Sequence, residues 1–334
     1  MSAPFPQVRM RRLRHPANLR ALVREHRVGV NDLVLPLFIK EGQGIKNPIQ
    51  SLSGHYQWSL DCLRDEIQHI VDLNIPAVIL FGIPVHKDSQ GSSALSANGV
   101  IQSAISAIKE WAPQLLVISD LCFCEYTDHG HCGVISSHHQ GEVMVDNDAT
   151  LNLLAEQAVS HARAGADVIA PSGMMDGMVQ AIRHGLDQHG FLSTPILSYA
   201  VKYASSFYGP FREAAGSGVP QHGGRQTYQM DPANAQSGLR EAELDVLEGA
   251  DMLMVKPAHT YLDMIFRVKQ QFPSLPLGAY HVSGEYAMIK AAAAQGWIDE
   301  KRAMLEALIA IKRAGADFII TYSAKEVAKL VSGD

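Results

Sequence analysis

Three of the four cysteines in this 334-residue chain lie within eleven residues of one another, at Cys122, Cys124 and Cys132. They follow the apolar run 115–119, which places sulfur ligands at the end of a predicted buried strand. Thiolates bind zinc well, and three protein ligands leave the fourth tetrahedral position open for water or substrate. Structural zinc modules instead use four ligands, usually as two separated pairs. The spacing therefore predicts a catalytic zinc site on these three cysteines.

Two other questions about this segment stay open. Free cysteines pack well in hydrophobic cores, so the three thiols could be small buried side chains, although their position among glycine, histidine and aspartate favours a metal. His129 and His131 could complete the metal shell, but a role as polar loop residues is the favoured explanation for each. Cys62 lies in a helical pattern and is predicted to be a core residue.

Two lysines stand directly after apolar runs: Lys202 follows 197–201 and Lys256 follows 252–255. An ammonium group beside a buried strand must be neutralised or paired. The reference pKa of lysine is about 10.4, so burial and a neighbouring cation must lower it before a free amine is available to attack a carbonyl and form a Schiff base. A structural ion pair would explain either lysine alone. Two such lysines together with a zinc cluster favour catalysis.

Two arginines and a glutamine follow the first of these lysines. Arg212 lies ten residues after Lys202, and Arg225 and Gln229 lie in a loop-like segment beyond it. Guanidinium geometry suits a carboxylate, so these residues indicate recognition of an acidic substrate. Glu241 begins a later helical stretch, where stabilisation of the helix N-terminus is sufficient to explain an acidic side chain.

Short apolar runs alternate with helical patterns along the chain. Most of the runs are continuous, as expected for parallel strands that are buried on both faces, and the alternation implies a parallel sheet. The eight predicted strands are Leu33 to Ile39, Ala77 to Gly82, Leu115 to Ser119, Val168 to Ala170, Ile196 to Tyr199, Met252 to Val255, Leu277 to Tyr280 and Phe318 to Tyr322. The clearest helical patterns are Leu60 to Leu73, Leu151 to Ala164, Tyr261 to Phe272, Tyr286 to Gln295 and Lys301 to Ala314.

One helix-to-strand turn occurs three times, as Ala164-Gly-Ala-Asp167, Glu248-Gly-Ala-Asp251 and Ala314-Gly-Ala-Asp317. In each, the glycine can end the preceding helix in the left-handed conformation before the next strand begins. Eight strands, this chain length and the lack of a visible linker predict an α/β fold, a TIM (β/α)8 barrel, over residues 31–334. The stretch 214–237, rich in Gly, Gln and Ser, is predicted to be a long loop or lid.

The reactive groups of a TIM barrel lie at the C-terminal ends of its strands. In this chain those ends carry a ring of polar groups on an apolar wall, which predicts an active site at that mouth. The residues at these strand ends, wall and ring together, are Phe81, Asp120, Ser172, Lys202, Lys256, His281, Ser283 and Tyr322.

Composition excludes several functions. The chain is 47% hydrophobic and 19% charged with a net charge of −6, so it can bury a large core but gives no general reason to bind nucleic acid or an anionic membrane. No apolar stretch reaches the length of a membrane span, and the N-terminus lacks the apolar core of a signal peptide. We therefore expect a cytoplasmic protein, in which clustered thiols serve as metal ligands more often than as disulfides.

The first 30 residues are strongly basic. An arginine-rich segment poor in acidic residues is typical of transit peptides, but three prolines interrupt this one, and it runs directly into the first predicted strand. We expect residues 1–30 to be an extended N-terminal arm that packs on a neighbouring subunit. The arginines are Arg9, Arg11, Arg12, Arg14, Arg20, Arg24 and Arg27.

Four segments closely resemble the 5-aminolevulinate dehydratase family, also called the porphobilinogen synthase family. They are Asp120-Leu-Cys-Phe-Cys-Glu-Tyr-Thr-Asp-His-Gly-His-Cys-Gly133, Lys202-Tyr-Ala-Ser-Ser-Phe-Tyr-Gly-Pro-Phe-Arg212, Met254-Val-Lys-Pro257 and Tyr280-His-Val-Ser-Gly-Glu-Tyr-Ala-Met288. The resemblance runs from about 11 to about 322. It implies a TIM barrel with an N-terminal arm, assembled as a homo-octamer. It also implies a lyase of tetrapyrrole (haem) biosynthesis that condenses two 5-aminolevulinate molecules into porphobilinogen with loss of two waters.

The resemblance also implies roles for individual residues. Lys256 would be the principal Schiff-base lysine and Lys202 its partner, and the three cysteines would hold a catalytic zinc that acts as a Lewis acid. Asp120 and Ser172 match groups that contact substrate near the zinc. The remaining substrate-binding positions are Tyr208, the set Arg212, Arg225 and Gln229 for one carboxylate, and the pair Ser283 and Tyr322 for the other.

Some features depart from the family pattern or remain open. Thr227 stands where some zinc-type members have another cysteine, which puts a second zinc site with His131 in doubt. Residues 136–144, with His138 and His139, resemble an insertion of no assigned function. Glu241 matches the position that holds an allosteric magnesium in some members. Two alternatives are a class I aldolase, which needs neither thiolate zinc nor a second lysine, and a zinc-stabilised binding protein with four closed ligands and no catalysis.

Overall fold

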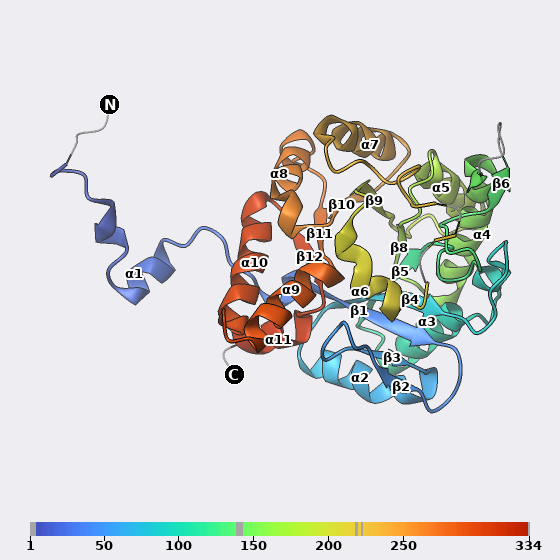
Figure 1. Cartoon of the computed structure of the whole chain (residues 1–334), viewed down its shortest axis with the longest axis horizontal. Coiled ribbons are helices and arrows are strands. Elements are labelled where there is room, and N and C mark those ends of the chain that lie inside the picture. Colours follow the sequence, from blue (N-terminus) through green and yellow to red (C-terminus); the bar gives the residue numbers. More distant parts are fainter. Residues whose placement is uncertain (1–4, 138–142, 218–219, 222, 333–334) are drawn as a thin grey trace.

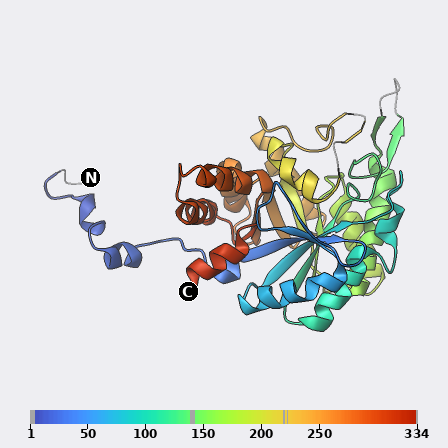
Figure 2. The ribbon, with the colours of Figure 1, turned by 60° about the horizontal axis from the view of Figure 1, so that its bottom comes forward.

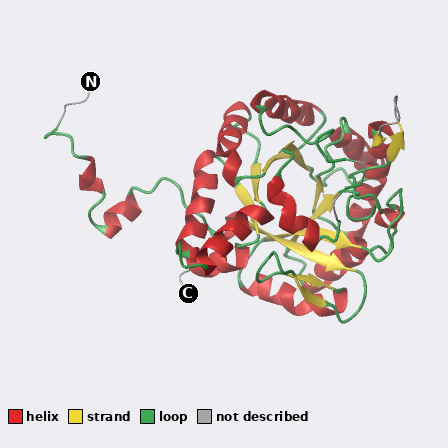
Figure 3. Cartoon of the chain, viewed as in Figure 1, coloured by secondary structure: helices red, strands yellow, loops and turns green. Residues whose placement is uncertain are grey.

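The computed structural model describes residues 5–137, 143–217, 220–221 and 223–332. Eight parallel strands form one sheet in the order β8-β5-β4-β1-β12-β11-β10-β9. The two ends of that order meet at a bridge between Ile169 and Ile196, so the sheet closes into a barrel (Figure 3). The strands are β1 (Leu33–Lys40), β4 (Ala77–Ile83), β5 (Leu116–Leu121), β8 (Val168–Pro171), β9 (Leu197–Lys202), β10 (Met252–Lys256), β11 (Leu277–His281) and β12 (Phe318–Thr321).

Helices surround the barrel because each buries one apolar face against the strands. In α3 (Val100–Trp111) the buried residues Ile101, Ala104, Ile105 and Ile108 recur at helical spacing. The other outer helices are α2 (Leu60–Asp72), α4 (Asn147–Ala164), α5 (Met178–Gln188), α7 (Ala235–Leu247), α8 (Leu262–Gln271), α10 (Glu300–Ala314) and α11 (Ala324–Val331). The predicted TIM barrel and all eight predicted strands are confirmed.

The repeated helix-to-strand turn has a structural function at the N-terminal ends of the strands. Gly165, Gly249 and Gly315 have φ values of 105°, 105° and 122°, in the region that favours glycine. The aspartate two residues later accepts a hydrogen bond from the backbone N–H of a neighbouring strand. The three bonds are Val117 N to Asp167 (2.8 Å), Ile196 N to Asp251 (2.8 Å) and Leu277 N to Asp317 (2.7 Å).

Several shorter elements lie at the C-terminal end of the barrel, opposite the repeated turns. The short helix α6 (Gly209–Ala214) lies across the opening of the ring of strands, next to α9 (Ser283–Ala294) (Figure 1). The loops on this side contain β2 (Lys46–Pro48) with β3 (Tyr56–Trp58), β6 (Ile135–Ser137) with β7 (Val143–Val145), and the 3-10 turns η3 (Ser92–Leu95), η4 (Ser206–Tyr208) and η5 (His259–Tyr261). The turn η2 (Val30–Asp32) instead directly precedes β1, at the N-terminal end. His138 and His139 of the predicted insertion lie outside the described residues.

The N-terminal segment projects away from the barrel (Figures 1 and 2). It contains η1 (Met10–Leu13) and α1 (Ala17–Leu22), neither of which has a buried residue. The exposed fractions of Phe5, Met10 and Leu22 are 72%, 62% and 77%. Packing of this arm on a neighbouring subunit stays a prediction. Among the described residues, the structure contains no helix with the length and apolarity needed to cross a membrane.

Candidate active site

A small cavity lies at the C-terminal mouth of the barrel, beneath α6. It leaves about 20 Å³, room for about one water molecule, because the side chains of the mouth fill most of the space. Its wall combines residues from four strands, β4, β5, β9 and β10, with residues of the segments that follow the strands. They are Phe81, Asp120, Cys124, Glu125, Ser172, Lys202, Tyr208, Phe211, Arg212, Arg225 and Lys256.

The two lysines are neighbours in the sheet, because the register of β9 and β10 pairs Lys202 with Lys256. Lys202 Nζ donates a 2.5 Å hydrogen bond to Ser172 O. Lys256 Nζ instead lies among aromatic rings, 4.2 Å from the ring centre of Tyr280 and 5.1 Å from that of Tyr199. Burial, reinforced by the charge of Lys202, lowers the pKa of Lys256 to about 7. A large fraction of Lys256 is therefore a free amine at neutral pH.

Asp120 lies beside both lysines at the end of β5. Its Oδ2 accepts a 3.0 Å hydrogen bond from Ser172 Oγ, whereas the buried Oδ1 has no protein partner. Burial raises the pKa of Asp120, although the positive charges of Lys256 and Lys202 oppose that shift. Burial and the two ammonium groups therefore act on the Asp120 carboxyl group in opposite directions, and burial has the larger effect.

The three cysteines form one buried group at the same mouth. The sulfur atoms of Cys122, Cys124 and Cys132 all lie within 4.8 Å of one another, and those of Cys122 and Cys124 are 3.2 Å apart. Three thiolates bound to one tetrahedral zinc have sulfur separations of roughly 3.8 Å, so the cluster fits a zinc ion after small adjustments. Hydrogen bonds from Cys122 and Cys124 lower the pKa of Cys132, whereas the neighbouring thiols and burial raise those of Cys122 and Cys124, so the three sulfur atoms share their protons as one group.

Neither neighbouring histidine belongs to this thiol group in the described part of the chain. His131 Nε2 lies 2.6 Å from Gln221 O, and its Nδ1 lies 3.2 Å from Tyr228 Oη. His129 Nε2 lies 3.2 Å from Ser89 O. These contacts connect the loop to its surroundings, which agrees with the interpretation of both histidines as polar loop residues.

Comparison with known proteins identifies the group to which this arrangement belongs. The sequence matches the delta-aminolevulinic acid dehydratase family over residues 7–330. The chain belongs to that family. It is an enzyme family of the lyase class, so the chain is not a binding protein without catalysis.

The similarity to individual members is high. A delta-aminolevulinic acid dehydratase of Halalkalibacterium halodurans is 57% identical over 321 residues, 96% of each chain. One of Synechocystis is 56% identical over 97% of this chain and 98% of its own. A crystal structure of the Toxoplasma gondii delta-aminolevulinic acid dehydratase (porphobilinogen synthase) in complex with its product porphobilinogen is 44% identical, with a TM-score of 0.93, and the match covers 97% of this chain and 91% of that chain.

The residues that the dehydratase resemblance assigns to one carboxylate come together beside the thiols. Arg212 and Arg225 both line the cavity, and Arg225 Nη2 donates a 3.0 Å hydrogen bond to Gly130 O. Arg225 Nε and Gln229 Nε2 are buried donors without a protein partner. Unsatisfied buried donors are costly, so this pair is suited to an acidic ligand.

The hydroxyls of the other predicted substrate-binding residues already have partners. Ser283 Oγ accepts from Phe211 N (3.0 Å) and donates to Phe207 O (3.2 Å). Tyr322 Oη lies 3.3 Å from Tyr280 Oη. Tyr208 Oη bonds to Tyr203 O (2.7 Å) and Lys256 O (3.2 Å), so it supports the backbone of the lysine while its ring lines the cavity. A substrate carboxylate would have to replace some of these contacts.

Glu241, the predicted magnesium ligand, lies away from the cavity. It is half-buried on α7, and burial together with the charges of Asp176 and Glu248 raises the pKa of its carboxyl group. A concentration of negative charge is compatible with a cation, but within the described residues the only preassembled group of potential metal ligands is the three cysteines. The magnesium role stays a prediction.

The structure adds site residues that sequence reasoning does not identify. Glu125 is buried in the cavity wall, and its Oε2 lies 3.2 Å from Cys124 Sγ. Burial, together with the charge of Asp120, raises the pKa of Glu125 to about 7. The rings of Tyr199, Tyr280 and Phe211 enclose the Lys256 amine. Inspection of strand ends omits Glu125 because it lies in a loop, but its position next to Cys124 is a usable sequence signal.

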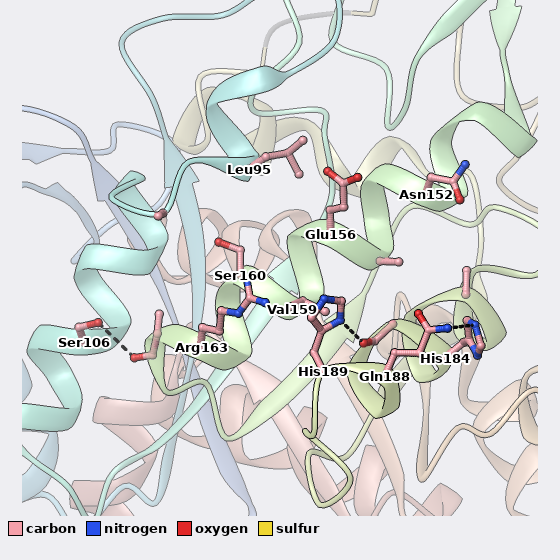
Figure 4. Close-up of a pocket in the computed structure, with 15 residues that line it drawn as sticks. Leu95, Ser106, Asn152, Glu156, Val159, Ser160, Arg163, His184, Gln188 and His189 are labelled. Carbon is pink, nitrogen blue, oxygen red and sulfur yellow. Dashed lines mark hydrogen bonds between the residues drawn. The ribbon is translucent and has the colours of Figure 1, made fainter.

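A second hollow of about 820 Å³ lies outside the barrel between α3, α4 and α5 (Figure 4). Its polar side chains mostly satisfy one another or the local backbone. Gln188 Nε2 lies 2.7 Å from His184 Nε2, and His189 Nδ1 lies 2.8 Å from Gly185 O. It is remote from the C-terminal strand ends, where barrel enzymes carry out chemistry, and is therefore not the candidate active site.

Proposed function

We propose that this protein condenses two molecules of 5-aminolevulinate into porphobilinogen with release of two waters, using Lys256 and Lys202 as Schiff-base amines and a zinc ion on Cys122, Cys124 and Cys132. Family membership supports the overall reaction. The observation that carries the residue assignment is the shared cavity, which joins adjacent lysines from β9 and β10 to a thiol of the cysteine cluster.

Lys256 is the better nucleophile of the proposed pair because its pKa is lowered to about 7 and its amine lies against aromatic rings. The free amine attacks the ketone carbon of a substrate, and loss of one water gives the imine. Asp120 Oδ1 has no protein partner, and burial raises the pKa of this carboxyl group, so its protonated form can pass a proton to the departing hydroxyl. Ser172 Oγ holds the other oxygen of Asp120, which fixes the orientation of the carboxyl group.

The site must treat two identical substrates differently. Lys202 holds the second carbonyl carbon, so that two bound molecules react instead of two freely diffusing ones. Arg212, Arg225 and Gln229 would bind the carboxylate of one molecule, and Ser283 and Tyr322 that of the other. When bound to the thiols, zinc supplies a Lewis acid at one side of the cavity. The asymmetry of these two halves would decide which molecule provides the nucleophilic amine.

Borohydride reduction in the presence of 5-aminolevulinate, followed by peptide mapping, tests this assignment. We expect a reduced adduct on the peptide that contains Lys256, because borohydride converts the imine into a stable secondary amine. Lys301, on the outer helix α10, provides a matched control, and Lys301→Ala should leave the adduct unchanged. An unmodified Lys256 peptide in active protein would contradict the proposal.

We further propose that the N-terminal arm packs on another copy of the chain, as a homo-octamer requires. The support is a set of exposed apolar side chains, including Phe5, Met10 and Leu22, on a segment that projects away from its own barrel (Figures 1 and 2). Light scattering of the full chain and of a variant without residues 1–27 tests this. The shortened protein should form smaller assemblies, and an unchanged assembly size would contradict the proposal.

Magnesium binding at Glu241 is a separate proposal that rests on the family resemblance and on the negative charge shared with Asp176 and Glu248. Added magnesium should increase the activity of the unaltered protein but not that of Glu241→Gln. Equal stimulation of both proteins would remove Glu241 from the site. Because Glu241 lies outside the cavity, neither result depends on the roles of the lysines.

A further inference from the structure

Glu285 is a completely buried carboxyl group that does not line the cavity. It lies in the first turn of α9, two residues after Ser283, and its exposed fraction is 0%. A buried carboxylate needs compensating charges or hydrogen bonds. Among the ion pairs of the described residues, none involves Glu285, so hydrogen bonds must provide the compensation.

Three backbone N–H groups provide it. Glu285 Oε1 accepts from His259 N (2.7 Å) and Thr260 N (3.2 Å), and Oε2 accepts from Val282 N (2.9 Å). The first two donors belong to η5, in the loop that follows β10, whereas the third precedes α9. A single carboxylate therefore connects the segments that follow two neighbouring strands of the barrel.

Helix capping explains only part of this arrangement. The bond from Val282 N is an ordinary capping contact of a glutamate in the third position of a helix. The bonds from His259 and Thr260 are not capping contacts of α9, because those donors come from a different loop. One oxygen thus stabilises the start of the helix, and the other holds the loop behind Lys256.

Both connected segments carry groups of the proposed reaction. Lys256 lies three residues before His259, and its carbonyl oxygen accepts from Tyr203 N (3.0 Å) and Tyr208 Oη (3.2 Å). Ser283 holds η4 and the start of α6 through its hydrogen bonds with Phe207 and Phe211. The amine and the predicted carboxylate-binding hydroxyl are therefore fixed in relation to each other through Glu285.

We propose that Glu285 is a positioning residue, which holds the Lys256 amine at the correct distance from Ser283 by binding the loops behind both. This role rests on the proposed function, since it requires Lys256 to attack a substrate whose carboxylate is bound near Ser283. Lys202 belongs to β9 and has no bond to Glu285, so its own reaction with substrate does not require this contact.

Glu285→Gln tests the role with minimal change in shape. The amide keeps one acceptor oxygen but places an NH₂ group against a backbone N–H, so one of the two loops must move. A displacement of about 1 Å in a reacting group can cost about 10²-fold in rate. We expect the rate of borohydride-trapped adduct formation at Lys256 to fall about 10- to 100-fold together with kcat, and adduct formation at the Lys202 peptide to stay within about twofold of normal.

Asp317→Asn is the matched control. Asp317 also binds a backbone N–H, that of Leu277, and an ammonium group, that of Lys269, but it does so at the opposite end of β11. It should lower the melting temperature while leaving kcat and the Lys256 adduct rate unchanged. If Glu285→Gln does not fold, Glu285→Asp provides the same measurement, because the shorter side chain keeps both carboxyl oxygens but cannot reach both loops.

The outcomes are distinct. A selective loss at Lys256 in a Glu285 variant supports the role. A Glu285 variant that lowers only the melting temperature overturns it, as does an equal loss of adduct at Lys256 and Lys202, which would indicate general loosening of the barrel. If the unaltered protein forms no adduct at Lys256, the proposed function fails and this role fails with it.

Discussion

The two ends of the barrel treat polar groups in opposite ways: the aspartates at one end are partly or largely exposed and hydrogen-bonded, whereas polar atoms at the other are buried. At the N-terminal end, Asp167, Asp251 and Asp317 each accept a hydrogen bond from a neighbouring strand, and Lys109 and Lys269 pair with two of them. At the C-terminal mouth, by contrast, several buried polar atoms have no protein partner. They are Asp120 Oδ1, Arg225 Nε and Gln229 Nε2. The aspartates at one end stabilise the fold through satisfied hydrogen bonds, whereas the unpartnered atoms at the mouth are available to a ligand.

The largest expected effect comes from removing the Lys256 amine at the mouth. Lys256→Ala should lower turnover by roughly 10³-fold or more, because it removes a positioned nucleophile. The fold should persist, since the lost amine is a buried polar group without an ion pair among the described residues. Steady-state turnover and circular dichroism check the two parts.

Lys256→Met controls for the cavity that alanine leaves, because methionine fills a similar volume without an amine. Both variants should lack activity. Substantial turnover in the methionine variant would show that catalysis does not require the Lys256 amine. The unpartnered polar atoms at the mouth would then have no demonstrated link to the reaction.

Metal removal should have the next largest effect. A chelator should abolish turnover, and added zinc should restore it, because the three thiols provide the proposed Lewis-acid site. The matched pair is Cys132→Ser and Cys62→Ser. Cys132 belongs to the thiol cluster, whereas Cys62 lies on α2. Elemental analysis should find zinc lost only in the first variant.

Full turnover in protein that is verified to be free of metal would contradict the zinc assignment. It would instead favour a mechanism of the class I aldolase kind, in which the lysine acts alone. The lysine prediction and the zinc prediction can therefore fail independently, so the experiments test the lysine pair and the cysteine cluster separately.

The pH dependence of adduct formation gives a smaller but more specific test. The reactive form of Lys256 is the free amine, and burial with the charge of Lys202 lowers its pKa to about 7. The trapping rate should rise about tenfold per pH unit below that value and level off above it. The groups that face the amine are Lys202, Asp120, Cys124 and Glu125.

Lys202→Met sharpens this prediction because it removes the neighbouring positive charge but retains burial. The midpoint for trapping at Lys256 should move to higher pH. An unchanged midpoint in Lys202→Met would mean that the two amines do not interact electrostatically. In the unaltered protein, a midpoint near the ordinary lysine pKa would mean that the Lys256 amine is hydrated.

The sequence predicts the strands well because parallel strands buried on both faces are continuous apolar runs, and their polar ends mark the mouth. Lys202, Lys256 and the cysteines are recognisable because amines and clustered thiols are rare beside such strands. The same logic identifies the glycines of the repeated turn, since each needs a left-handed backbone conformation.

Sequence patterns do not predict hydrogen bonds between segments that are far apart in the chain. The bond from Val117 to Asp167 spans fifty residues, and those of Glu285 to His259 and Thr260 join separate loops. Tyr208 shows the same limit, because its motif indicates substrate binding but its hydroxyl supports the Lys256 backbone. Local pattern gives the position of each element along the chain, whereas the partners of buried polar groups depend on how the barrel closes.

The smallest expected effect is at the opposite end of the barrel. Asp167→Asn should lower the free energy of unfolding by about 1–2 kcal/mol, because a partly exposed carboxylate loses its charge-assisted bonds to Val117 N and Lys109 Nζ. Turnover should be unchanged, since neither partner lies at the mouth. Denaturant unfolding and steady-state kinetics measure the two quantities separately. A large fall in kcat with little loss of stability would mean that the Asp167 hydrogen bonds control the geometry of β5 at the mouth. In that case the N-terminal end would contribute to catalysis as well as to stability.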